Sequence, residues 1–315
     1  MKSHRHRHRN AKHKVDPAQH VTLEIPHSVD SGKAIPTAAP KHEESTAALP
    51  PEVYLIGCST VTANADQPTA QVIGSKAWNL LRVVQMSLPV PPAFVLGTHY
   101  CLDPAAREQA ASPNLWKGVL HALELVTGLG LGDSRHPLLL SVRSGAPISM
   151  PGMMETLLNI GLCDATVAGL LRQTGNPRLV WDAYRRLVAT YGEVVASLPG
   201  QLFDEVTTTL FGACDERELD FADLRALTLR FLEVYAQAAG RRFPQEPDLQ
   251  LAGAIESVFA SWQCPKACEY RRLNRIPDTI GTAVTVQSMV FGNAGGQSGA
   301  GVGFTRDPAT GEPAL

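Results

Sequence analysis

Residues 137–162, PLLLSVRSGAPISMPGMMETLLNIGL, constrain the fold more than any other stretch of the chain. The apolar run 138–142 is bounded by turn-forming residues, which favours a strand that is covered on both faces. Arg143 follows at the expected end of this strand, and the loop 144–154 then contains two glycines and two prolines. A fixed cation beside a glycine-containing loop with exposed backbone N–H groups suits the binding of phosphate oxygens. The stretch therefore predicts a phosphate-binding loop after a buried strand.

The composition is that of a chain with a sizeable core and no strong overall charge. Its 315 residues are 44% hydrophobic and 18% charged, with a net charge of −2. This balance gives no reason to expect nucleic acid or a membrane as partner, and no apolar run reaches the roughly 20 residues of a membrane helix. Residues 1–51 are polar, basic at the start and rich in proline, so we expect a disordered tail. The six cysteines are too scattered for a disulfide framework, which indicates reduced thiols and a cytoplasmic protein.

The first ordered part predicts a strand at 53–57 and a helix that begins after Gly74 and Ser75. Lys76 then falls in the first turn of this helix, where the positive end of the helix dipole disfavours a lysine. The position is explained if an anion binds there, although an ordinary surface lysine is the alternative. An extended segment at 93–96 and a helix at 116–127 complete the predicted elements before residue 137.

Residues 165–275 predict a mostly helical block. Helices are expected at 164–173, after the strong start signal Asn176-Pro177, at 222–239, and at 248–262 with Asp248 as its cap. Aromatic and aliphatic side chains recur at helical spacing from 181 to 195, which indicates core packing more than a cofactor site. Beyond this block the alternating, β-branched run 282–291 predicts a strand, and the glycine-dense segment that follows ends in an expected hairpin.

The chemistry predicted from these parts is the binding of a nucleotide triphosphate. The chain contains no P-loop motif, no dinucleotide-binding glycine motif between strand and helix, no G-x-S-x-G and no H-E-x-x-H. What remains is Lys76, Arg143, the loop 144–154 and the strand 282–291. Two cations and backbone donors are the groups that phosphoryl transfer needs for positioning and charge neutralisation. Mg2+ would also need carboxylates, for which Glu155, Asp307 and Glu312 are weak candidates.

At this point the sequence resembles the N-terminal nucleotide-binding domain of the pyruvate, phosphate dikinase family. The resemblance covers roughly 52–315, and its most specific parts are the MPGMM loop and the QSMVFGN strand. The matching segments are 141–145, 149–156, 176–178, 181–186, 270–274, 281–284, 287–293 and 304–308.

The resemblance implies an α+β, ATP-grasp-like domain with an inserted helical subdomain. It divides the chain into the tail 1–51, a first ATP-grasp part 52–164, the helical subdomain 165–275, and a truncated second part 276–315. By position, Lys76 and Arg143 match the cationic catalytic contacts to the ATP phosphates, and Gly152 and Met153 lie in the covering loop. Gln287, Met289 and Val290 fall on the strand expected to border adenine. ATP and Mg2+ are the implied cofactors, and the metal ligands remain open, with Asp307 and Glu312 as candidates.

The family chemistry implied by the resemblance converts ATP, phosphate and pyruvate to AMP, pyrophosphate and phosphoenolpyruvate through a phosphohistidine. The phosphohistidine and pyruvate-binding domains are expected in a separate or missing chain, so this chain alone is not expected to perform the full reaction. Two alternatives stay open at this stage. One is a non-catalytic ATP-binding remnant or regulatory fragment, and the other is a relative of phosphoenolpyruvate synthase or glucan, water dikinase.

Overall fold

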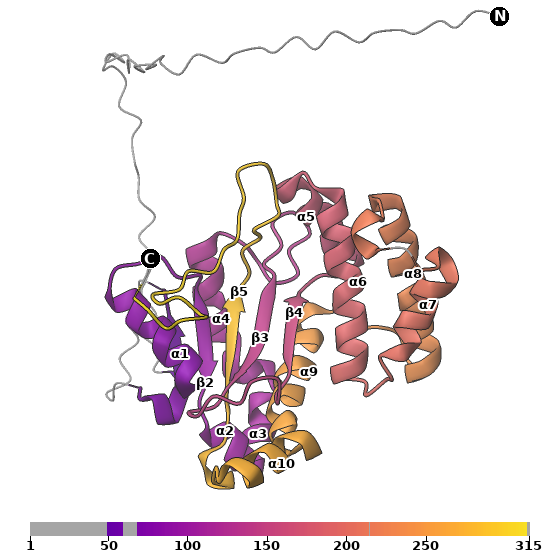
Figure 1. Ribbon diagram of the computed structural model, residues 1–315. Helices are drawn as coiled ribbons and strands as arrows, with labels where there is room; N and C mark the ends of the chain where they lie inside the picture. The colour runs from indigo at the N-terminus through magenta and orange to yellow at the C-terminus, as the bar shows by residue number, and fades with distance from the viewer. Residues whose placement is uncertain (1–48, 59–67, 214, 314–315) are drawn as a thin grey trace, which may run out of the picture. The chain divides into compact units, whose positions relative to one another are not determined.

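The computed structural model describes residues 49–58, 68–213 and 215–313 (Figure 1). All but the last three residues of the predicted disordered tail, 1–51, lie outside the described part. The strands are β1 (Val53–Ile56), β2 (Ala93–Leu96), β3 (Leu140–Gly145), β4 (Thr156–Ile160) and β5 (Ala283–Ser288). The helices are α1 (Ala70–Gln85), α2 (His99–Leu102), α3 (Pro104–Ala110), α4 (Pro113–Thr127), α5 (Asp164–Thr174), α6 (Pro177–Val194), α7 (Gln201–Phe211), α8 (Phe221–Ala239), α9 (Pro247–Ala260) and α10 (Pro265–Asn274).

The five strands form one antiparallel sheet in the order β1-β2-β5-β3-β4. The last strand in the chain, β5, therefore lies between β2 and β3. Its register aligns Ala283 with Gly145 and Ser288 with Leu140, so β3 and β5 run side by side over their full lengths. Mixed helix and antiparallel sheet confirm the α+β class.

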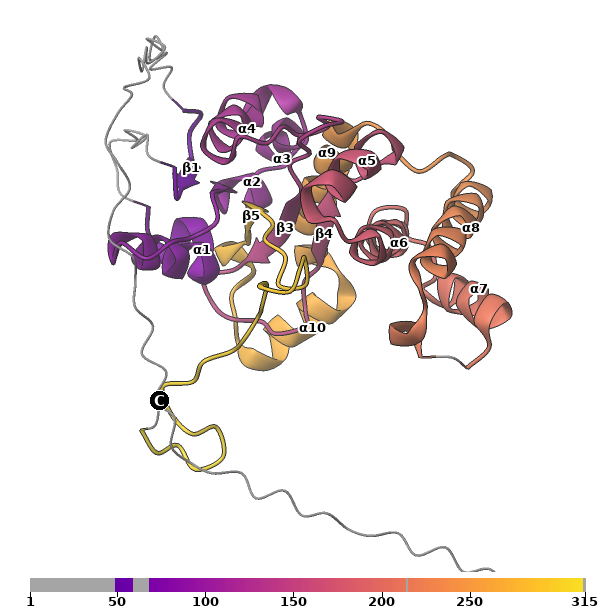
Figure 2. The same cartoon turned by 90° about the horizontal axis from the view of Figure 1, so that it is seen from above.

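The two faces of the sheet have different cover. Strand residues alternate between faces, and one set, including Val142, Val284 and Phe94, joins the large buried cluster formed with α4, α6 and α9. On the other face α1 packs Ile73 and Ala77 over β1, β2 and the start of β5. Figures 1 and 2 show α1 and α9 on opposite sides of the sheet. This partly covered face is where the predicted cations fall.

The helices after β4 pack as the aromatic pattern predicted. Tyr184 and Tyr191 are 1% and 2% exposed, and both rings meet Phe243 edge-on. Asn176 caps α6 by accepting a hydrogen bond from the Leu179 amide at 3.0 Å. Arg185 is buried and its guanidinium bonds Glu216 and Asp182, so this arginine joins helix α6 to the turn before α8.

Several element boundaries differ from the sequence prediction. Strand β3 continues to Gly145, so Arg143 lies within the strand, because pairing with β5 extends the ladder past the apolar run. Strand β5 ends at Ser288, three residues before the expected end. Helix α9 begins at Pro247 with Glu246 at the cap position, so the predicted Asp248 cap is wrong. The expected terminal hairpin is also absent in the described residues after 291, where only an isolated bridge joins Arg306 and Pro313.

The division into 52–164, 165–275 and 276–315 stays a prediction. Within the predicted helical subdomain, α9 contacts β3, β4 and β5, whereas α6 and α8 pack mainly on each other. Across the described residues, none of the helices combines the length and apolarity needed to span a bilayer.

Candidate functional site

The site begins with a glycine contact that docks α1 on the end of β3. Gly74 has φ +76°, which interrupts the helical conformation of α1 and makes Ser75 the start of its second segment. A Cβ atom at Gly74 would lie 1.8 Å from the Gly145 carbonyl oxygen, so only glycine permits this approach. The amide and hydroxyl of Ser75 each donate to the carbonyl oxygen of Ala146 at 3.1 Å. The first turn after Gly74 is thereby fixed beside the phosphate-binding loop.

The structure brings the two predicted cations together at this junction. Lys76 Nζ donates to the Ser144 carbonyl oxygen at 3.0 Å, and Arg143 is the exposed residue of β3 just before it. Partial burial lowers the pKa of the Lys76 amine, and the charge of Arg143 lowers this pKa further. Within the described residues neither cation has a carboxylate partner. Two uncompensated positive charges at a helix start attract an anion.

Beside these cations, polar side chains line one face of the sheet. Ser141, Thr285 and Gln287 share the face of Arg143, because cross-strand partners in an antiparallel pair point the same way. Ser141 Oγ donates to the Gln287 carbonyl at 3.3 Å, and Gln287 Nε2 donates to the Pro91 carbonyl at 3.0 Å. The predicted residue Gln287 is thus held against β2, which leaves its side-chain oxygen to contact a ligand. Ser141 and Thr285 were not among the predicted site residues, although strand alternation places them on this face.

The loop between β3 and β4 is anchored on both sides of an exposed tip. Met150 is buried, and Met153 packs on the main cluster, with Cys264 Sγ donating to its carbonyl at 3.8 Å. Gly152 is exposed with φ +69°, and a Cβ there would meet nothing within 4 Å. The tip at Gly152 is therefore open to solvent, whereas Met153 is turned toward the core.

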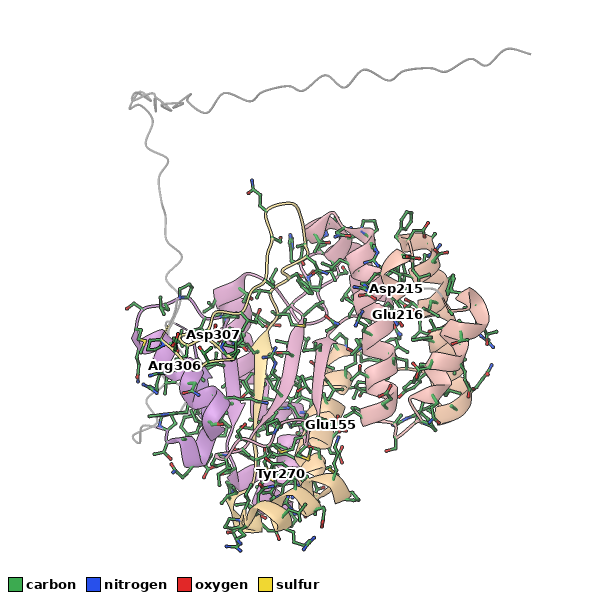
Figure 3. The ribbon with its side chains drawn as sticks, in the orientation of Figure 1. Glu155, Asp215, Glu216, Tyr270, Arg306 and Asp307 are labelled. Carbon is green, nitrogen blue, oxygen red and sulfur yellow. The ribbon has the colours of Figure 1, made fainter. Side chains whose placement is uncertain are left out.

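Glu155 is the last residue of this loop before β4 and lies at the α10 end of the sheet (Figure 3). Its carboxylate accepts a hydrogen bond from Lys266 Nζ at 2.9 Å, and this ion pair raises the pKa of Lys266. The ion pair ties the loop to α10, which is a structural use for the carboxylate that had been a weak metal candidate.

The predicted adenine-side residues lie at the opposite end of β5. Met289 and Val290 follow the last strand residue, and the Met289 amide donates to the Leu139 carbonyl at 2.9 Å. The sulfur of Met289 accepts the Asn159 amide at 3.0 Å, whereas Val290 is 75% exposed. The five residue steps from Ala283 to Ser288 correspond to about 17 Å at the rise of an antiparallel strand. Along β5, Gln287 lies two residues and Met289 four residues beyond Thr285, the cross-strand partner of Arg143, and Met289 packs on the large buried cluster.

The carboxylates suggested for a metal do not join the cations. Asp307 accepts hydrogen bonds from the amides of Ala309 and Thr310, which lower its pKa and close an exposed turn that also contains Glu312. Figure 3 labels Asp307 in front of α1, and Figure 2 shows this segment running away from the helices. Among residues 49–58, 68–213 and 215–313, no three His, Cys, Asp or Glu side chains are grouped to hold a metal. The described residues thus do not form a Mg2+ site by themselves.

Two surface hollows lie away from these residues. One is between α7 and α8, and the other is beside Arg135, His136 and Arg172. The predicted cations instead are exposed beside a polar sheet face, which is bordered by α1 and by the β3–β4 loop and whose residues Ser141, Thr285 and Gln287 are buried. This arrangement can neutralise and orient a polyphosphate along the strands.

Comparison with known proteins matches the same region. A family model described as "Pyruvate phosphate dikinase, AMP/ATP-binding domain" matches residues 107–315, which include Arg143 and the loop but not Lys76. Pyruvate, phosphate dikinase 2 of Zea mays is 44% identical over 251 residues, covering 78% of this chain and 28% of the relative. Pyruvate, phosphate dikinase of Clostridium symbiosum is 42% identical over 251 residues, covering 78% and 29%. That of Rhizobium meliloti (strain 1021) is 40% identical over 269 residues, covering 84% and 30%. The chain spans less than a third of these relatives' lengths.

Proposed function

Because the chain belongs to the family of the pyruvate phosphate dikinase AMP/ATP-binding domain, we propose that it binds ATP along the polar face of β3 and β5. The triphosphate lies at the Lys76 and Arg143 end, and adenine lies toward Gln287, Met289 and Val290. The observation that carries this placement is the pair of cations that have no carboxylate partner among the described residues, at one end of a polar strand pair. The ATP-grasp assignment belongs to the same proposal.

The proposed phosphate contacts follow from the geometry of the junction. Lys76 is a compact charge on a long stem, so its ammonium can exchange the Ser144 carbonyl for a phosphate oxygen. Arg143 offers a planar fork of donors that fits two phosphate oxygens at once. The exposed tip at Gly152 can bring backbone N–H groups close to the phosphates, with Met153 holding the loop behind it. These groups orient the nucleotide and neutralise charge during phosphoryl transfer.

We further propose that the chain supplies the ATP-binding step of a phosphotransferase like its relatives, which are named pyruvate, phosphate dikinases. The histidine that accepts the phosphoryl group and the pyruvate site are then provided by sequence outside this chain. Mg2+ stays a prediction, as an ion that accompanies the nucleotide phosphates.

The test is calorimetric titration of ATP into the chain and its Arg143→Ala and Lys76→Ala variants. Each lost charge-assisted hydrogen bond is expected to weaken ATP binding roughly 10- to 100-fold. Lys117→Ala is the matched control, because Lys117 is an exposed lysine on α4 outside the site. Adenosine, which lacks phosphates, should bind all four proteins alike. Equal ATP affinity in the wild type and both site variants would overturn the phosphate placement.

A further inference from the structure

Thr285 is a buried threonine whose hydroxyl has no partner among the residues that the structure describes. Its side chain lies in the middle of β5 and the residue is only 2% exposed, yet Oγ1 makes no hydrogen bond to any of them. A buried hydroxyl without a partner costs free energy that an apolar side chain of the same shape would avoid. Thr285 therefore needs an explanation beyond the preference of strands for β-branched residues.

The other buried threonines of the described chain show what is ordinary here. Thr98, Thr166, Thr228 and Thr282 each donate to a backbone carbonyl, at 3.2, 3.0, 2.7 and 3.1 Å. Thr282, three residues before Thr285, also accepts the Gly145 amide. Among the buried threonines of the described residues, Thr285 is thus the exception, because its hydroxyl has no hydrogen-bond partner.

The exception lies at the candidate site. Thr285 is the cross-strand partner of Arg143, so both side chains point to the same face of the sheet. A Cβ built on Gly145 would be 3.9 Å from Thr285 Oγ1, which puts the hydroxyl beside the backbone that contacts Gly74. Lys76 reaches the same backbone one residue earlier, at Ser144. The Thr285 hydroxyl therefore lies close to Lys76, to Arg143 and to the contact between Gly74 and Gly145.

We propose that Thr285 is a further ATP-binding residue, whose hydroxyl donates a hydrogen bond to a phosphate oxygen of the nucleotide. This assignment rests on the proposed function. In the free protein the hydroxyl is covered, and Lys76 donates to the Ser144 carbonyl. When Lys76 and Arg143 turn toward the phosphates, the hydroxyl becomes accessible and gains the acceptor that the free protein lacks. Its stability cost in the free state is then recovered on binding.

The test compares Thr285→Val, which keeps the shape and removes the hydroxyl, with Thr285→Ser, which keeps the hydroxyl. Titration of ATP should show Thr285→Val binding roughly 10- to 100-fold more weakly, with adenosine affinity unchanged. Thr285→Ser should retain most of the wild-type ATP affinity. Urea unfolding without ligand should show Thr285→Val at least as stable as the wild type.

Thr228→Val provides the control for removing a buried hydroxyl that has partners. Thr228 Oγ1 bonds the carbonyls of Leu224 and Trp181, so this variant should lose stability and keep its ATP affinity. Wild-type ATP affinity in Thr285→Val would overturn the assignment of Thr285 and leave the proposed function standing. Equal losses of ATP and adenosine affinity in this variant, or a loss of its stability, would also overturn the assignment of Thr285 only. A wild-type chain that binds no ATP would overturn the proposed function together with this assignment.

Discussion

At the scale of single residues, the proposed ATP binding depends on the protonation of Lys76. Partial burial and the neighbouring Arg143 both disfavour the charged lysine, and they lower its pKa in the free protein. A bound phosphate favours the charged form and raises the same pKa. Binding above the pKa of the free lysine must therefore take up a proton, and affinity must fall as the pH rises through that value.

The first prediction is that ATP affinity begins to fall at a pH below about 10.4, the usual pKa of a lysine. Titrations at increasing alkaline pH should show affinity falling for the wild type. Removing the repelling charge with Arg143→Ala raises the pKa of Lys76, so the fall should move to higher pH. Lys76→Met should bind weakly at every pH and lose this dependence. A Lys76→Met variant with the wild-type pH dependence would exclude Lys76 as its source.

At the scale of elements, the decisive feature is the close contact of α1 with the end of β3. Gly74 contributes both a positive φ and the missing Cβ, whereas Gly152 contributes a positive φ in open space. The same substitution at these two glycines therefore separates steric packing from backbone strain. Both positions lie in segments that we propose to contact phosphate.

The second prediction concerns the stability of Gly74→Ala and Gly152→Ala. The Gly152 variant should lose about 1 kcal/mol of unfolding free energy, the cost of a left-handed conformation. The Gly74 variant should lose clearly more, since its Cβ overlaps the Gly145 carbonyl and forces α1 away from β3. Urea unfolding measures both. Equal losses in the two variants would show that the contact of Gly74 with Gly145 does not hold α1 in place.

Sequence patterns predicted the elements that local residues determine. The strand at 93–96 and the helix after Asn176 are confirmed, because caps and apolar periodicity act over a few residues. The helix predicted to begin after Gly74 and Ser75 begins earlier, at Ala70, and Gly74 is a kink inside it. The extension of β3 to Gly145 was missed, because it depends on pairing with β5, well over 100 residues later. The same long-range pairing hid Thr285, whose burial without a partner can be recognised only in the folded chain.

At the scale of the whole molecule, one face of the sheet packs in the core, and the other carries the residues that we propose to bind ATP. One face joins the large buried cluster with α9, and the other has its apolar cover only where α1 packs. The remaining part of that face carries Arg143 and the polar side chains of β3 and β5. The free cysteines of the described residues are Cys58, Cys101, Cys163, Cys264 and Cys268, and Cys214 lies outside these residues. The fold thus places two exposed cations, Lys76 and Arg143, beside a polar strand pair, where we propose that the ligand binds.

Hydrogen–deuterium exchange with and without ATP tests most directly whether ATP binds beside Lys76, Arg143 and the strands β3 and β5. Bound ATP should slow exchange in the turn 74–76, in the loop 146–155 and at 289–292. Exchange should stay unchanged at the α7–α8 hollow, around 202–210 and 230–238. The Arg143→Ala variant, at the same ATP concentration, should show weaker protection in the same segments. ATP protection confined to the α7–α8 hollow or to the Arg135 and Arg172 surface would contradict the account.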